Sequence, residues 1–452
     1  MRLPYKRIHI VGAGGAGMSA IAKVLVAQGY EVSGSDLRGG ATLEGLADIG
    51  VAVFTGHHPE VAVSADLVVA SSAVPEYDQE LAAAHDEGIP TWRRPQFLEA
   101  LTSDISTIGA TGTHGKTTTT ALMITALQST GLDPSFVMGG ELSHLGTNGH
   151  VGTSDLLVLE ADEAFRTYES LHLDGLVVTN VEAEHLEHFG TEQDLIDSFV
   201  SVAESVSGPV IACVDDRGAA EVASRARTLT YGQSPAAAWR IEGLERKGPG
   251  STFQLVGPTG SVNVELQQPG RHVALNATGG LALLAELGHD LDAIARGLSA
   301  FRGVDRRWEH RGTVAGVVMY DDYAHHPTEV RATLEAASGV AQGRLWAVFQ
   351  PHLYSRTERL SDEFGAALSS ADVVVVTDVY GAREEPVPGV TGELVADAAR
   401  AAGAEVYYVP HRADLVEFLL PKVASGDLVL TMGAGDITLL HTEFASRLGA
   451  LT

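Results

Sequence analysis

The chain has 452 residues, of which 45% are hydrophobic and 19% are charged, and its formal net charge is −28. At roughly 150 residues per domain this length predicts three domains, and the composition is that of a globular protein rather than a disordered or fibrous one. The negative charge argues against nucleic acid as a partner, because a phosphate backbone requires a cationic face.

The first residues run directly into an apolar strand and a glycine-rich turn, without the apolar region and cleavage site of a signal peptide. No continuous apolar stretch is long enough to cross a membrane, so we expect no membrane insertion. Cys213 is the only cysteine in the sequence, which excludes a disulfide within the chain. These features predict a cytoplasmic protein, which we expect to be a monomer or a homodimer.

The first segment, residues 1–102, alternates strand-like and helix-like stretches. An apolar strand at residues 8–11 leads into a GxGxxG turn at residues 12–17. The backbone amides of such a turn bind the diphosphate of a dinucleotide or equally of a UDP-sugar, and a purely structural turn is the less favoured interpretation. Later strands of the segment end in polar residues. The expected ligand-binding residues are Gly12, Gly14, Gly15, Gly17, Met18, Ser35, Asp36, Ser71 and Ser72.

The central segment, residues 103–309, contains a phosphate-binding loop between an apolar strand and a helix-like stretch. Gly112 and Gly115 leave room for backbone N–H groups around phosphate oxygens, and the Lys116 side chain can reach the β- and γ-phosphates. The Thr117 hydroxyl can bind Mg²⁺. The strict pattern has glycine where Ala110 stands. The expected phosphate-binding residues are Gly112, Thr113, His114, Gly115, Lys116, Thr117 and Thr118.

Two further strands of this segment end in acidic residues. An apolar strand at residues 155–159 places Glu160 at a strand end, where a second Mg²⁺ ligand belongs. Residues 175–180 lead into a cluster of acids and histidines that contains His185. Such a cluster is often only the solvated start of a helix, but this one follows a strand end of the same predicted sheet.

The final segment, residues 310–452, has four strand-like stretches that end in polar or glycine-rich loops. This pattern predicts a further α/β sheet with its own ligand-binding edge. His325 and His326 follow the first of these strands without a cysteine or a suitably spaced partner for zinc. We therefore expect them to donate hydrogen bonds to a phosphate or an amino acid.

Together these motifs resemble those of the Mur ligases, ATP-dependent amide-forming enzymes of peptidoglycan precursor synthesis. The resemblance covers nearly the whole chain. Besides the phosphate-binding loop and the first glycine-rich turn, it rests on residues 160–163, 179–185, 270–276, 306–309, 321–329 and 349–357. It implies an α/β protein of three domains, with a Rossmann-like N-terminal domain (1–102), a central P-loop ATPase-like domain with a mostly parallel sheet (103–309) and a Rossmann-like C-terminal domain (310–452).

The resemblance also implies ligands and residue roles. The ligands would be ATP, Mg²⁺, UDP-N-acetylmuramate and L-alanine, and the lactyl carboxylate would be activated as an acyl phosphate. The implied catalytic residues are Lys116, His185 and Arg307, and the implied Mg²⁺ ligands are Thr117, Glu160 and His185. Asn276, Arg307 and Asp322 would contact ATP, and His326, His352 and Arg356 would bind substrate, Arg356 through the carboxylate of the amino acid.

The chain departs from the family pattern after Glu163. Relatives commonly have Asp-Glu-Ser-Asp where residues 162–165 read Asp-Glu-Ala-Phe, and Val273, Trp308 and Leu353 are further departures. A related ligase that adds another amino acid or a peptide is therefore an alternative. An NAD-dependent oxidoreductase would use only the first glycine-rich turn, and a regulatory nucleotide-binding module would leave the acids and arginines without a role.

Overall fold

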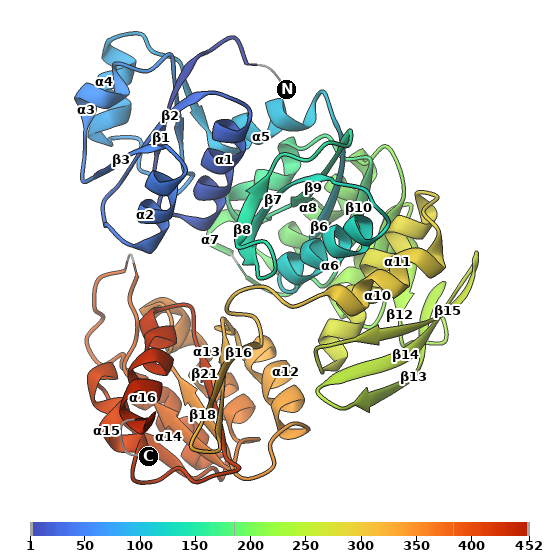
Figure 1. The fold of residues 1–452 in the computed structure, drawn as a ribbon, viewed down its shortest axis with the longest axis vertical. Coiled ribbons are helices and arrows are strands. Elements are labelled where there is room, and N and C mark those ends of the chain that lie inside the picture. Colours follow the sequence, from blue (N-terminus) through green and yellow to red (C-terminus); the bar gives the residue numbers. More distant parts are fainter. Residues whose placement is uncertain (1–2, 185, 383, 450–452) are drawn as a thin grey trace. The chain divides into compact units, whose positions relative to one another are not determined.

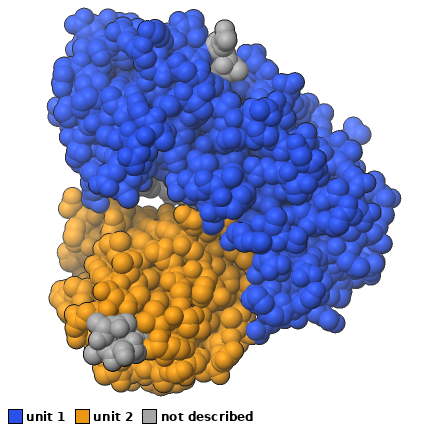
Figure 2. All heavy atoms as spheres, in the orientation of Figure 1, with its two compact units in different colours: residues 1–267, 273–302 blue, residues 268–272, 303–452 orange. Residues whose placement is uncertain are grey.

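The computed structural model describes residues 3–184, 186–382 and 384–449 (Figure 1). Contacts divide the chain into two compact units, residues 1–267 with 273–302 and residues 268–272 with 303–452 (Figure 2). The described strands form three sheets, two in the first unit and one in the second. Helices connect most of the parallel strands in each of the three sheets, which confirms the predicted α/β class.

The first sheet is parallel throughout and has the order β3-β2-β1-β4-β5. Its strands are β1 (Arg7–Val11), β2 (Glu31–Asp36), β3 (Ala52–Thr55), β4 (Leu67–Ala70) and β5 (Thr91–Arg93), with helices α1 (Ala16–Ala27), α2 (Ala41–Asp48), α3 (Pro59–Ala62), α4 (Gln79–Asp86) and α5 (Arg94–Thr102). The strand order reverses between β1 and β4. Ligands of open α/β sheets bind at such a reversal, and the glycine-rich turn follows β1 at this point.

The second sheet has ten strands in the order β15-β14-β13-β12-β11-β10-β6-β9-β7-β8. The strands are β6 (Ser106–Thr111), β7 (Ser135–Leu142), β8 (Thr147–His150), β9 (Leu156–Glu160), β10 (Gly175–Val178), β11 (Val210–Cys213), β12 (Leu229–Gly232), β13 (Trp239–Lys247), β14 (Gly250–Gly257) and β15 (Gly260–Leu266). Strand β6 lies between β10 and β9 and is parallel to both. The loops after these three strands therefore leave the same edge of the sheet.

The helices around this sheet include several short ones. They are α6 (Lys116–Ser129), η1 (Ala164–Ser170), α7 (Leu186–Phe189), α8 (Glu192–Ser205), α9 (Arg217–Arg225), α10 (Arg271–Glu286), α11 (Leu291–Gly297) and η2 (Leu298–Ala300), where η marks a 3-10 helix. Only α6 starts directly from the phosphate-binding loop. It is buried on nearly every side, so the loop is attached to the interior of the domain.

The sheet of the second unit has the order β16-β17-β21-β18-β19-β20. Its strands are β16 (Glu309–Val314), β17 (Val317–Asp322), β18 (Leu345–Phe349), β19 (Val373–Val376), β20 (Val406–Tyr408) and β21 (Leu428–Met432). Its helices are α12 (Pro327–Ser338), α13 (Tyr354–Leu368), α14 (Gly392–Ala401), η3 (Arg412–Asp414), α15 (Leu415–Leu419), η4 (Asp436–Leu439) and α16 (Leu440–Gly449). Alternate residues of β18 belong to two separate hydrophobic clusters, because both faces of this strand are covered.

None of the helices in the described ranges is both long enough and apolar enough to cross a membrane. The division into two units keeps the first two sheets together, and it assigns the third sheet to the second unit. The finer limits at residues 102 and 309 stay predictions.

Candidate active site

The phosphate-binding loop is held in a conformation that only glycine adopts without strain. Gly112 has a φ of 132° and Gly115 a φ of 83°. A Cβ on Gly112 would lie 2.1 Å from the Thr179 hydroxyl oxygen, and one on Gly115 would lie 2.6 Å from Oδ1 of Asn276. The loop backbone is therefore packed directly against two polar side chains, and Asn276, predicted to contact ATP, lies beside it on α10.

The loop after β10 fixes the phosphate-binding loop by hydrogen bonds. The backbone N–H of Thr113 donates to the Asn180 carbonyl at 3.0 Å. The N–H of His114 donates to Oδ1 of Asn180 at 2.7 Å, and the Thr179 hydroxyl donates to the His114 carbonyl at 2.6 Å. These bonds preorganise the loop backbone, so a phosphate would meet N–H groups that are already in place.

The Lys116 ammonium lies among loop carbonyls and carboxylates. It donates to the carbonyl of Gly112 at 2.7 Å and to that of Thr113 at 3.2 Å, and it lies 2.8 Å from Oε2 of Glu163. Asp162 is farther away, with Oδ1 at 3.8 Å. Burial lowers the pKa of Lys116, but the carboxylates of Glu163 and Asp162 outweigh it and leave the pKa raised. The ammonium therefore stays charged.

Glu163 is the most buried of the acids next to Lys116, with 1% of its surface exposed. Burial raises its pKa to about 7, although the Lys116 ammonium acts in the opposite direction. The sequence predicted only Glu160 as a functional acid of this stretch. Glu160 pairs in register with Ala110 of β6, and its Oε2 accepts a hydrogen bond from the Gly139 N–H at 2.6 Å.

The residues present fit a nucleotide phosphate with its metal ion. The N-cap of α6, Gly115, has no capping side chain, and first-turn N–H groups of a helix favour an anion. Thr117 in this turn and Glu160 at the end of β9 offer the hard oxygen donors that Mg²⁺ prefers. His185, the third predicted ligand, lies outside the described residues.

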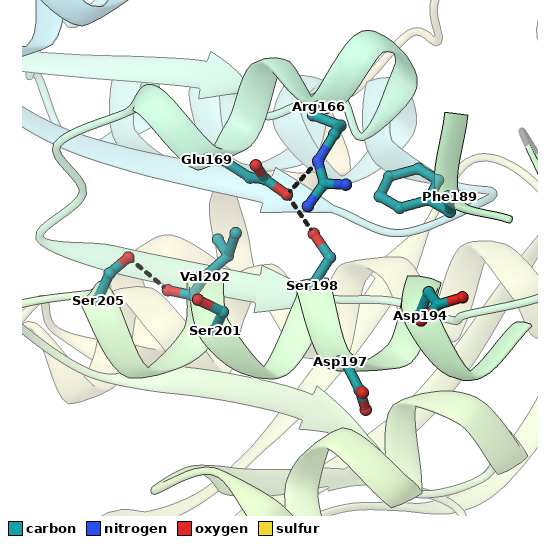
Figure 3. A pocket seen from close by; sticks show the side chains of 9 residues that line it. All are labelled: Arg166, Glu169, Phe189, Asp194, Asp197, Ser198, Ser201, Val202 and Ser205. Atoms are coloured by element: carbon teal, nitrogen blue, oxygen red, sulfur yellow. Dashed lines mark hydrogen bonds and ion pairs between the residues drawn. The ribbon is translucent and has the colours of Figure 1, made fainter. Parts of the chain in front are cut away.

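The departure from the family pattern after Glu163 forms the 3-10 helix η1. Phe165 and Arg166 both have a positive φ, at 55° and 56°. A pocket of about 650 Å³ lies between this segment and α8. Figure 3 shows how Arg166 and Ser198 both point toward Glu169 there. The Glu169 Oε1 accepts from the Arg166 Nε at 2.9 Å and from the Ser198 hydroxyl at 2.6 Å. The altered segment is thus anchored to α8 by its own polar contacts.

The glycine-rich turn after β1 is fixed by the end of β2. The N–H groups of Gly12 and Ala13 both donate to the Ser35 carbonyl at 2.9 Å, and the Gly14 N–H donates to Oδ2 of Asp36 at 3.0 Å. The Ser35 hydroxyl is buried and donates to Oε2 of Glu80 at 2.6 Å. Asp36 and Ser35, both predicted to bind ligand, therefore hold the turn and the sheet in this structure.

The other predicted residues of this turn have different environments. Gly12 needs its φ of 82°, and Met18 is buried with 2% of its surface exposed. The Ser71 hydroxyl accepts a hydrogen bond from the Ala73 N–H at 3.3 Å. Within the described residues, the buried Ser72 hydroxyl has no hydrogen-bond partner.

In the second unit, two arginines lie against one aromatic ring. The guanidinium carbons of Arg306 and Arg307 are each 5.0 Å from the centre of the Tyr323 ring. Arg307 also pairs with Oε1 of Glu329 at 3.3 Å. The neighbouring Asp322 accepts hydrogen bonds from the N–H groups of Trp308 and Ala324, each at 2.8 Å, and burial raises its pKa to about 6. This carboxyl thus holds the segment that carries both arginines, before β16, and the loop after β17 that contains Tyr323.

The remaining predicted residues of this unit follow the ends of β17 and β18. The rings of His325 and His352 are 5.8 Å apart, and His352 stacks on Tyr380. Burial lowers the pKa of His325 to about 3, so this ring is neutral. His326 caps α12 by accepting from the Thr328 N–H, and Arg356 is buried in the first turn of α13. The structure thus brings these histidines and Arg356 to one edge of the sheet.

Comparisons with known proteins identify the family to which this chain belongs. The Mur ligase family catalytic domain matches residues 7–105, the Mur ligase middle domain residues 110–284 and the Mur ligase glutamate ligase domain residues 306–435. The chain belongs to the Mur ligase family. This assignment confirms the predicted fold of three α/β domains.

Named relatives match along almost the whole chain. The UDP-N-acetylmuramate–L-alanine ligase of Mycobacteroides abscessus is 44% identical over 98% of this chain and 96% of its own. That of Cutibacterium acnes is 45% identical over 96% of this chain and 94% of its own. A crystal structure of UDP-N-acetylmuramate-alanine ligase from Thermotoga maritima superposes with a TM-score of 0.87 at 27% identity, over 99% of this chain and 100% of that one.

The contact between Gly115 and Asn276 predicts that Gly115→Ala damages the loop. Gly131 has nearly the same φ, 87°, with no atom within 4 Å of an added Cβ, so Gly131→Ala is a matched control for backbone strain alone. We expect Gly115→Ala to lose about 1–3 kcal/mol more stability than Gly131→Ala, the usual cost of overpacking, and to lose ATP binding. Thermal unfolding with and without ATP measures both effects, and equal behaviour of the two variants would contradict the prediction.

The environment of Glu163 predicts a pH dependence of nucleotide binding. Its pKa of about 7 means that the carboxyl becomes ionised between pH 6 and pH 8, where it holds Lys116 and repels phosphate. ATP should therefore bind more tightly at pH 6 than at pH 8. The ratio of the ATP affinity at pH 6 to that at pH 8 should be about 3–10-fold larger in the wild type than in Glu163→Gln. The nucleotide's own titration remains in the variant. Titration calorimetry that gives the same ratio for both proteins would refute the prediction.

Proposed function

We propose that this chain uses ATP to join L-alanine to the lactyl carboxylate of UDP-N-acetylmuramate, a step in peptidoglycan precursor synthesis. The observation that carries the chemistry is the charged Lys116 within a preorganised phosphate-binding loop beside carboxylates. The proposed substrates are those in the name of eight relatives, all called UDP-N-acetylmuramate–L-alanine ligase. These relatives are 42–45% identical over 96–98% of this chain.

Activating a carboxylate with ATP needs charge neutralisation and positioning more than acid and base catalysis. The Lys116 ammonium would exchange Glu163 for the β- and γ-phosphate oxygens. Thr117 and Glu160 would hold Mg²⁺, which neutralises phosphate charge. The lactyl carboxylate oxygen takes the γ-phosphoryl group and ADP leaves. The neutral amine of L-alanine then attacks the acyl carbon, the carbon–oxygen bond to phosphate breaks, and inorganic phosphate leaves while the attacking nitrogen gives up a proton to form the amide.

The second unit supplies further proposed contacts. We assign Arg307 and Asp322 to ATP, as well as Asn276 of the first unit. Arg307 contributes its positive charge, while Asp322 acts through the loops that it holds. Arg356 would pair with the carboxylate of L-alanine, since a guanidinium fork fits a carboxylate, and His326 and His352 would lie around it. The three segments 1–102, 103–309 and 310–452 are assigned to the UDP-substrate, to ATP and to the ligation step.

We further infer a cytoplasmic protein, as a monomer or a homodimer. The thiol of Cys213 is buried, and burial raises its pKa to about 11, so it stays protonated. An unreactive free thiol is compatible with a reducing compartment.

The function is tested by ADP release with UDP-N-acetylmuramate and a panel of amino acids. We expect release that requires both UDP-N-acetylmuramate and L-alanine. Lys116→Ala should lower the rate at least about 100-fold, because it removes the charge that stabilises the transferring phosphoryl group. Lys6→Ala, at an exposed lysine paired with Glu31, is the matched control and should keep the rate. ADP release that needs neither acceptor, or a stronger response to another amino acid, would overturn the assignment.

The role of Arg356 is tested by its Michaelis constants. Arg356→Ala should raise the KM for the amino acid about 10–100-fold, the loss expected for a charge-assisted hydrogen bond, and leave the KM for ATP within about threefold. Arg359 is exposed one turn along the same helix, and Arg359→Ala is the control for α13. An unchanged KM for the amino acid in Arg356→Ala would refute the role.

A further inference from the structure

Arg94, at the start of α5, packs against the glycine-rich turn of the first sheet. A Cβ added to Gly17 would lie 2.9 Å from the guanidinium carbon of Arg94 and 3.1 Å from both its Nε and Nη2. Gly17 belongs to the first turn of α1. The guanidinium plane therefore lies directly on the helix start that follows the turn, and only glycine at position 17 leaves room for it.

Most hydrogen-bond donors of Arg94 are unused. Its Nη1 donates to Oδ2 of Asp162 at 3.4 Å, which is long for a charged pair. Its Nε is buried without a partner, and no acceptor among the described residues bonds to Nη2. The side chain is 17% exposed. The buried Nε of a guanidinium is costly to leave without a partner, and an acceptor-rich ligand would supply one.

The surroundings of Arg94 favour an anion. The N-cap of α1, Gly15, has no capping side chain, and the first turn of α1 contains no acidic residue. First-turn N–H groups attract negative charge, and a guanidinium fork binds phosphate oxygens through parallel hydrogen bonds. The nearby Asp36 is occupied by the Gly14 N–H. A cation and a helix start thus face the same turn.

We propose that Arg94 binds the diphosphate of the UDP-substrate and that Asp162 is the positioning residue that holds its guanidinium beside Gly17. The inference rests on the proposed function, which supplies the UDP group. Asp162 is also 3.8 Å from the Lys116 ammonium. One carboxylate therefore lies between the cation for the diphosphate and the cation for the ATP phosphates.

The test compares UDP with uridine, which lacks the phosphates, in nuclear magnetic resonance titrations of the full chain. Arg94→Gln should weaken UDP binding about 10–100-fold and leave uridine binding unchanged. Arg94→Lys keeps the positive charge but loses the forked guanidinium, so its UDP affinity should lie between that of the wild type and that of Arg94→Gln. Arg7→Gln is the matched control, because Arg7 starts β1 at the opposite end of the strand from the turn and pairs with Asp66 at the surface.

The outcomes separate the inference from the function on which it rests. Unchanged UDP affinity in Arg94→Gln, or an equal loss of uridine and UDP, overturns the role of Arg94 while the proposed function stands. A wild-type chain that binds neither compound overturns the UDP-substrate itself and the inference with it. If Arg94→Gln binds UDP more weakly but uridine as well as the wild type does, and unfolds within a few degrees of the wild type, the role of Arg94 is supported.

Discussion

The ion pair between Lys116 and Glu163 is the interaction on which the central site depends. The ammonium is bound by two carbonyls of its own loop and by a buried carboxylate, so its charge is stabilised before any ligand arrives. The carboxylate in turn is tolerable inside the protein because the ammonium lies beside it. When a phosphate binds the Lys116 ammonium in place of Glu163, the buried Glu163 carboxylate loses its positive partner. Nucleotide binding is therefore connected to the protonation of Glu163.

The fold could be predicted from local patterns, whereas the partners of the functional groups could not. The phosphate-binding loop is a contiguous motif, and apolar strands that end in polar loops indicated the three sheets. The contact of Lys116 with Glu163 joins residues 47 positions apart, and that of Arg94 with Asp162 joins residues 68 positions apart. Both depend on which strands and helices become neighbours. Phe165 and Arg166 carry no signal of a positive φ, since neither is glycine.

The residue type also does not show whether a side chain binds a ligand or instead fixes the backbone of a neighbouring loop. Asp36 and Asp322 were both predicted to meet a nucleotide, and both carboxylates accept backbone N–H groups. The Asp322 carboxyl fixes Trp308 and Ala324, and with them the segment that carries the arginine pair and the loop that contains Tyr323. Carboxylates at strand ends are suited to both tasks, because such ends expose N–H groups and ligand-binding edges together. Sequence alone therefore locates the site more reliably than it assigns the atoms in contact with a ligand.

The single cysteine has a practical consequence for studying movement. Cys213 is buried on β11, and its protonated thiol is a poor nucleophile. The natural chain therefore offers a silent background for thiol-specific fluorophores or spin labels. A pair of cysteines introduced at exposed positions, one in each compact unit, would report the distance between the units without first replacing a native residue.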